Sequence, residues 1–187
     1  FVGAALVPML KANGHEVIRL VRQRGASEEA QVEWRPERGE IDVSALQGIE
    51  GVVHLAGENV FALRWTDSKK ERIRDSRVNG TQLLCRTLAE LPEKPKVLVS
   101  ASAIAYYGDT QDQPVSEDAP PSDMFLAQVC RDWEAATVYA EAAGIRVVKV
   151  RVGIVLHPSG GALKTMLPAF KLGMGGIVGP GTQYIPW

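Results

Sequence analysis

The sequence is poor in cysteine and histidine, which limits its metal and redox chemistry. Its 187 residues include two cysteines, Cys85 and Cys130, and three histidines that lie far apart in the chain. Neither set has the spacing of metal ligands, and two cysteines are too few for the multiple bridges that hold small secreted domains together. We therefore expect no metal site and no disulfide framework.

A charge excess of one sign and long apolar runs are also missing. The formal net charge is −1 and the sequence pI is about 6.4, so no overall attraction to nucleic acid or to an anionic membrane is expected. No apolar run approaches the roughly 18 residues that span a bilayer, and the N-terminus does not read as a signal peptide. We expect a cytoplasmic protein without nucleic-acid or membrane partners, and leave open whether it forms a homodimer.

The chain does contain alternating strand-like and helix-like segments. Short β-branched runs at 16–21, 51–55, 96–99 and 145–150 are separated by longer helical stretches. This alternation is typical of βαβ units, and the near-continuous apolar runs are typical of strands buried on both faces. The predicted fold is therefore α/β, a Rossmann-type doubly wound parallel sheet.

Helix boundaries can be read from local signals. Gly14 and Gly144 each stand between a helical stretch and a strand, where glycine commonly ends a helix. A capping-box pattern over 68–71 predicts the start of a long helix that ends at Leu91, before Pro92.

Both chain ends indicate a fragment. The sequence opens on Phe1 directly before a helical stretch and stops at Trp187 without a polar tail. We expect a nucleotide-binding domain over 1–156, truncated at its first strand. From His157 onward glycine and proline replace the periodic pattern, so 157–187 is predicted to begin a substrate-side lobe, also incomplete.

Dinucleotide binding is predicted from the starts of helices and the ends of strands. Val2 and Gly3 stand where a helix would begin, and backbone N–H groups at such a position bind a pyrophosphate. The next strand ends at Arg22, and no acidic residue follows until Glu28. An acid there would bind ribose hydroxyls, whereas an arginine pairs with a 2′-phosphate. The sequence thus favours NADP(H) over NAD(H).

A second cofactor contact is predicted after the strand at 51–55. Small residues follow its apolar run, and the carboxyl ends of strands are where open parallel sheets bind ligands. The residues expected to touch cofactor here are Leu55, Ala56, Gly57 and Glu58.

Taken in order, these motifs resemble the extended short-chain dehydrogenase/reductases. The segments HLAGENV, SASAIAYYG, FLAQVCRDWE, RVGIVL and the terminal GGIVGPGTQYIPW are similar, more narrowly, to an atypical branch of NAD(P)-dependent epimerase-family proteins sometimes mislabelled as cell-division inhibitors. The resemblance covers essentially the whole chain. It implies an NADP(H) cofactor bound also by Ser100, Ala101 and Arg77, the last in the place of a family asparagine.

The usual catalytic pair of that family is absent from the matching positions. Typical members carry a tyrosine four residues before a lysine, but counting back from Glu134 places Leu126 and Cys130 there. The family serine matches Ser102. Candidate catalytic residues are therefore Ser102, Tyr106 and Cys130, with Cys130 also beside the cofactor, although an apolar helix stripe would keep its thiol neutral.

Three functional hypotheses remain open at this point. The first is an NADP(H)-binding oxidoreductase or epimerase-like protein that acts on an unknown carbonyl or sugar-like substrate, with Arg151 as a further candidate for a cofactor or substrate phosphate. The second is a non-catalytic NADPH-binding module with a regulatory or redox-sensing role. The third is an ordinary sugar epimerase. They differ in whether a proton source stands near the nicotinamide.

Overall fold

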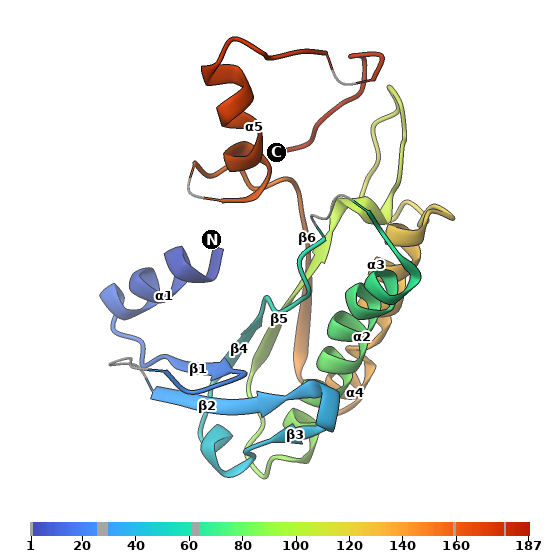
Figure 1. Cartoon of the computed structure of the whole chain (residues 1–187). Coiled ribbons are helices and arrows are strands. Elements are labelled where there is room, and N and C mark those ends of the chain that lie inside the picture. Colours follow the sequence, from blue (N-terminus) through green and yellow to red (C-terminus); the bar gives the residue numbers. More distant parts are fainter. Residues whose placement is uncertain (1, 26–29, 61–63, 159, 178) are drawn as a thin grey trace.

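The structure is a computed structural model that describes residues 2–25, 30–60, 64–158, 160–177 and 179–187 (Figure 1). Its helices and strands alternate along most of the chain. In order they are α1 (Val2–Ala12), β1 (Ile18–Val21), β2 (Ala30–Arg35), β3 (Glu40–Ile41), β4 (Gly51–His54), α2 (Asp67–Glu90), β5 (Val97–Ala103), α3 (Phe125–Ala135), α4 (Val138–Ala142), β6 (Arg146–Val152) and α5 (Gly161–Lys171), with short 3-10 helices at Pro36–Arg38, Ser44–Leu46 and Ile104–Tyr106.

The strands form two three-stranded sheets within the described residues. One has the order β4-β5-β6 and is parallel throughout; the other has the order β1-β2-β3, with β1 parallel to β2 and β3 antiparallel to it. The predicted parallel α/β fold is confirmed. The antiparallel β2–β3 pair is an exception, made possible because a turn at Gly39, where φ is +67°, reverses the chain within a few residues.

Helix boundaries agree with the sequence signals except at one cap. Gly14 and Gly144 both have a φ of +83°, the left-handed conformation that ends a helix at low cost for glycine. Helix α2, however, is capped by Thr66, whose side chain accepts a hydrogen bond from the Lys69 amide at 3.3 Å. The predicted capping box over 68–71 was wrong, because the helix begins one residue before Ser68.

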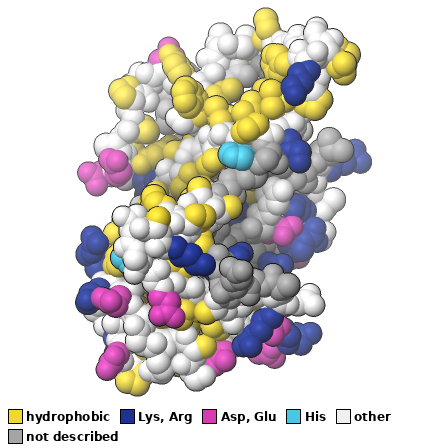
Figure 2. Space-filling view, turned by 90° about the vertical axis from the view of Figure 1, so that its left-hand side faces the viewer, with side chains coloured by type: hydrophobic (Ala, Val, Ile, Leu, Met, Phe, Trp, Pro, Cys, Tyr) yellow, Lys and Arg dark blue, Asp and Glu magenta, His cyan; other side chains and the backbone are white. Residues whose placement is uncertain are grey.

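One face of the β4-β5-β6 sheet carries the core, and α2, α3 and α4 cover it (Figure 1). Leu84 and Leu88 of α2 pack there with Leu98 of β5, each at most 1% exposed. On the same sheet, Val53 and Val150 are 43% and 41% exposed. The expectation that these strands are buried on both faces was therefore wrong for the described residues. Figure 2 shows the side of the molecule away from α2, α3 and α4, where hydrophobic side chains gather on the upper part.

The segment after β6 leaves the sheet and forms α5, which lies above the sheet in Figure 1. The fading sequence periodicity did not indicate this helix. The chain then returns, and the Ile154 amide donates to the Pro186 carbonyl at 2.9 Å. Among the described helices, none combines the length and the hydropathy needed to cross a membrane.

Candidate functional site

The four residues expected at strand ends do lie there. Arg22 directly follows β1, Gly57 follows β4 by three residues, and Ser102 and Arg151 are the penultimate residues of β5 and β6. Ser102 and Arg151 are also paired in the sheet register. The carboxyl ends of parallel strands, the usual ligand edge of such a sheet, therefore bring together polar and small residues from several segments.

The start of α1 lies against the end of β4. A Cβ added to Gly3 would stand 3.9 Å from Cδ1 of Leu55, an ordinary contact distance. The first turn of α1 holds no acidic residue. The free N–H groups at this helix start therefore have no acidic side chain in their own turn, and Phe1 lies outside the described residues.

Arg77 of α2 closes over the turn that follows β4. Its Nη1 donates to the carbonyl oxygens of Glu58 and Ile73, both at 3.0 Å, and its guanidinium stacks 5.1 Å from the Trp133 ring centre. A Cβ on Gly57 would come within 3.0 Å of the Arg77 Cζ. A side chain at position 57 would therefore require the guanidinium to shift. Burial lowers the pKa of Arg77.

Glu58 stands at the centre of a group of cations. Its carboxylate binds the Lys69 ammonium at 2.6 Å, which holds the pKa of Glu58 below its usual value, with smaller effects from the charges of Arg72 and Arg22. Arg22 is exposed and makes no hydrogen bond or ion pair with any residue the structure describes. The β1 end thus presents an exposed guanidinium whose charge acts on Glu58 without a hydrogen bond or an ion pair.

Cys130 is buried at the junction between α3 and β5. Burial raises the pKa of its thiol above the ordinary value, as the apolar stripe predicted, while Ala103, Arg77 and Ser102 oppose that shift. The thiol is therefore neutral near pH 7. Sequence spacing did not reveal that a cation, Arg77, lies close enough to act on it.

A charged network joins β5, α3 and β6. Ser102 Oγ donates to Glu134 Oε1 at 2.6 Å, and Arg151 binds both Glu134 oxygens, through Nε at 2.8 Å and Nη2 at 2.9 Å. Although burial acts to raise the pKa of Glu134, the hydrogen bonds from Arg151 and Ser102 hold it below its usual value. Glu134 is therefore an ionised acceptor at neutral pH.

Two tyrosines hold the far side of the Arg151 guanidinium. Its Nη1 donates to the Tyr107 hydroxyl at 2.7 Å and to the Glu117 carbonyl at 2.8 Å, and its Cζ lies 3.6 Å from the Tyr106 ring centre. Tyr107, Glu134 and Arg151 line an open cleft of about 940 Å³ whose other wall includes Tyr184. The cleft lies between the end of the sheet and the segment after β6.

A second network, neutral and closed, lies between α2, α3 and β4. The Trp133 indole donates to Thr81 Oγ1 at 2.9 Å, and Thr81 Oγ1 is 3.0 Å from Nε2 of His54. Burial lowers the pKa of His54 to about 4, so the ring that shares this hydrogen bond is neutral. This chain links α3, α2 and β4.

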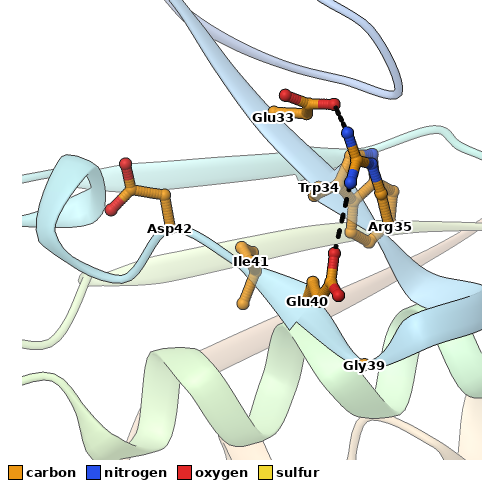
Figure 3. A pocket seen from close by; sticks show the side chains of 7 residues that line it. All are labelled: Glu33, Trp34, Arg35, Gly39, Glu40, Ile41 and Asp42. Atoms are coloured by element: carbon orange, nitrogen blue, oxygen red, sulfur yellow. Dashed lines mark hydrogen bonds and ion pairs between the residues drawn. The ribbon is translucent and has the colours of Figure 1, made fainter.

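A smaller hollow of about 360 Å³ lies apart from these networks, at the β2–β3 turn (Figure 3). Its charged lining is largely paired, since Arg35 binds Glu33 and also Glu40. No group of three or more histidine, cysteine or acidic residues that could hold a metal occurs in the described part of the chain.

The remaining candidates lie in several surroundings. Ser100 and Ala101 follow each other in β5, and the Ser100 hydroxyl, buried, reaches the Ala101 carbonyl at 3.4 Å. Ala56 packs against the core. Near the start of α2, Trp65 donates to the Val60 carbonyl at 3.0 Å and packs edge-on against Phe125.

Sequence reasoning did not assign three residues that hold these networks together. Glu134 served only to anchor the helix count, and Thr81 and Lys69 were not considered. The sequence feature that could have identified Glu134 as a site residue is its position on the same helix as Cys130, one turn further on.

A parallel α/β sheet with a bare helix start, small residues and arginines at its carboxyl edge defines a dinucleotide-binding protein of the Rossmann class. The sequence profile described as the NAD dependent epimerase/dehydratase family matches residues 1–187. The chain belongs to this family, and the resemblance inferred from its motifs is confirmed.

Several relatives and solved structures match the whole chain. Epimerase family protein Mb2239 of Mycobacterium bovis is 42% identical over 186 residues, and human epimerase family protein SDR39U1 is 36% identical over 190 residues. The chain covers 61% and 62% of those two proteins. It therefore spans about three-fifths of the length of these relatives.

Among solved structures, human SDR39U1 crystallised with NADPH superposes with a TM-score of 0.87 at 36% identity, covering 100% of this chain and 62% of that one. A nucleoside-diphosphate sugar epimerase from Corynebacterium glutamicum gives a TM-score of 0.85 at 40% identity, covering 100% of this chain and 38% of that one. Both similarities agree with the Rossmann arrangement described above.

The described residues suit a phosphorylated dinucleotide. The first turn of α1 offers N–H groups and holds no acidic residue, and Gly57 adds no side chain of its own at the strand end. Arg22 supplies an exposed guanidinium that no described carboxylate binds. This donor set, rich in N–H groups and cations, matches the chemistry of phosphate oxygens.

Proposed function

We propose that this chain forms the NADP(H)-binding part of an oxidoreductase or epimerase-like enzyme that acts on a carbonyl or sugar-like substrate. The observation that carries the proposal is Arg22, an exposed cation at the end of β1 that makes no hydrogen bond or ion pair with a described residue. The human relative crystallised with NADPH supports it. A 2′-phosphate is the ligand group that a guanidinium binds with two parallel hydrogen bonds.

Each other cofactor contact follows from its place in the fold. The amides of Val2 and Gly3 bind the pyrophosphate, and the backbone of Leu55, Ala56 and Gly57 lies along the adjoining ribose. When bound, the cofactor supplies a hydride to the substrate. The residues of this chain orient it, hold its phosphates and exclude water.

Cofactor preference tests this assignment. In the intact protein, Arg22→Ala should weaken NADPH binding on the order of tenfold or more, because one charge-assisted contact is lost, while NADH binding changes little. Isothermal titration of both cofactors measures the effect. Arg146→Ala is the matched control, since Arg146 is exposed at the opposite, amino-terminal end of β6. Equal weakening of both cofactors would contradict the NADP(H) assignment.

A second function, a non-catalytic NADPH-binding module, is favoured by one specific observation. Leu126 and Cys130 occupy the positions where the family's usual tyrosine and lysine would stand, and burial keeps the Cys130 thiol neutral. The two functions separate in one assay. A module of this kind binds NADPH but oxidises it with no carbonyl compound.

A further inference from the structure

The charged network contains one hydroxyl proton, that of Tyr107, for which the described residues supply no acceptor. We propose that the Tyr107 phenol is the proton donor of the site and that its acceptor is a carbonyl oxygen of the substrate. This inference rests on the proposed NADP(H) function and assigns it a catalytic residue.

Counting donors identifies the residue. Ser102 has one hydroxyl proton, and it goes to Glu134 at 2.6 Å, so Ser102 can only accept from a ligand. Arg151 donates through all three of its nitrogens, to Glu134 and Tyr107 as well as to a backbone carbonyl. Glu134 is ionised and has no proton to give.

Tyr107 differs from these residues. Its oxygen accepts from Arg151 at 2.7 Å, and its own O–H has no acceptor among the residues that the structure describes. Tyr107 also lines the cleft of about 940 Å³. The neighbouring Tyr106 is not part of that lining and contributes its ring face to Arg151. Of the two tyrosines, only Tyr107 combines a cation at its oxygen with access to a ligand-sized space.

The guanidinium is placed to stabilise the phenol after it loses its proton. Arg151 is locked by two hydrogen bonds to Glu134 and by the Tyr106 ring, so its charge stays beside the Tyr107 oxygen without rearrangement. A preorganised cation at an oxygen that develops negative charge lowers the barrier for proton transfer. Glu134 and Ser102 act through Arg151 and are positioning residues.

With NADPH bound, the cofactor would supply a hydride to the carbonyl carbon. The carbonyl π bond would break, and the Tyr107 proton would bond to the carbonyl oxygen. The substrate is reduced to an alcohol and NADPH is oxidised to NADP⁺. The Tyr107 phenolate, held by Arg151, then regains a proton from water in the open cleft. In the reverse direction the phenolate accepts the alcohol proton.

The test compares Tyr107→Phe with Tyr139→Phe in the intact protein. Tyr139 is a matched control because its hydroxyl also accepts from an arginine, Arg86 at 2.7 Å, but on the outer surface of α2 and α4. NADPH oxidation is followed with 4-nitrobenzaldehyde and dihydroxyacetone as probes, and NADPH affinity is titrated separately. Tyr106→Phe is assayed in parallel.

Tyr107→Phe should lower kcat on the order of a hundredfold or more while KM and NADPH affinity stay within about twofold, since proton transfer contributes to the transition state alone. Tyr139→Phe should leave kcat unchanged. Full turnover in Tyr107→Phe, loss confined to Tyr106→Phe, or an intact protein that binds NADPH and reduces neither probe would overturn the inference. Failure to bind NADPH would instead contradict the proposed function, so the two failures are distinguishable.

Discussion

Two polar networks share helix α3 and the β4-β5-β6 sheet, yet they differ in charge and in closure. The chain from Trp133 through Thr81 to His54 is neutral and buried, and each hydrogen bond ends on another member. The chain from Ser102 through Glu134 to Arg151 is ionised and reaches a cleft. In a closed network every buried polar group has a hydrogen-bond partner inside the protein, so the network stabilises the fold. An open network keeps one polar group available for a hydrogen bond to a ligand.

The two networks show that groups that stabilise the fold and groups that can act on a ligand lie in different parts of the same domain. Helix α3 contributes to both networks, with Trp133 to the neutral one and the adjacent Glu134 to the charged one. Side chains of consecutive helix residues point about 100° apart, so two neighbours in the sequence contact different parts of the protein. Removing a member of the closed network should therefore cost folding free energy, while a change in the open one should cost less.

The largest effect is expected for Thr81→Val. The hydroxyl is fully buried and serves two partners, so its loss leaves the Trp133 N–H and the His54 nitrogen without hydrogen bonds. We expect the free energy of unfolding to fall by about 3 kcal/mol, the sum of two unsatisfied groups. Urea unfolding measures it. Thr87→Val, a buried threonine on the same helix, should cost less than about 1 kcal/mol; equal losses would mean that the closed network adds no stability.

The second-largest loss of stability is expected on acidification, through protonation of His54. Its pKa is lowered from 6.5 to about 4 in the folded protein, so the unfolded chain binds the proton more readily. The stability from the neutral ring is present above pH 6.5 and is lost as the pH falls toward 4. We expect a loss of about 2 kcal/mol between about pH 7 and pH 5.

Proton NMR isolates that contribution. The His54 ring should still be neutral at about pH 5. A His54 resonance that titrates with an ordinary midpoint near 6.5 would contradict the closed network.

The smallest of the three effects is expected for Glu134→Gln. Its charge-assisted bonds to Arg151 and Ser102 are lost or weakened, so the free energy of unfolding should fall by about 1.5 kcal/mol at neutral pH. Because the folded pKa of Glu134 is lowered, this contribution is present above its ordinary pKa and disappears as the pH falls through the folded value. The difference between variant and wild type should therefore shrink in acid.

Glu141→Gln provides the comparison for that experiment. Glu141 pairs with Lys149 at 2.8 Å, but its side chain is 43% exposed. Exposed ion pairs contribute little, so the change should stay within about 0.5 kcal/mol. If both variants lost the same stability, the charged network would be no stronger than a surface pair.

Much of the fold could be predicted because its signals are local. Gly14 and Gly144 mark helix ends by a backbone conformation that other residues adopt at a cost, and four strands were found from their apolar runs. Strand β2 was missed although Val32 and Trp34 alternate with polar residues, because its alternation differs from the continuous apolar pattern of parallel strands.

The site was less predictable because its contacts join distant segments. Strand-end positions such as Arg22 and Gly57 follow from the sheet, whereas the bonds of Glu134 to Ser102 and Arg151 span 32 and 17 residues. Helical spacing indicated the buried Cys130, yet no spacing rule brings Arg77 toward it. Side-chain partners across elements depend on packing that a single sequence does not encode locally.

The close approach of Arg77 to Gly57 constrains how the two positions can vary together. A methyl group at 57 would meet the guanidinium at 3.0 Å, while that guanidinium is held by two carbonyls and by the Trp133 ring. An alanine at 57 would therefore require the guanidinium to shift by a few tenths of an ångström against these three contacts. In a library derived from this chain, we expect changes at 57 to depend on which residue stands at 77.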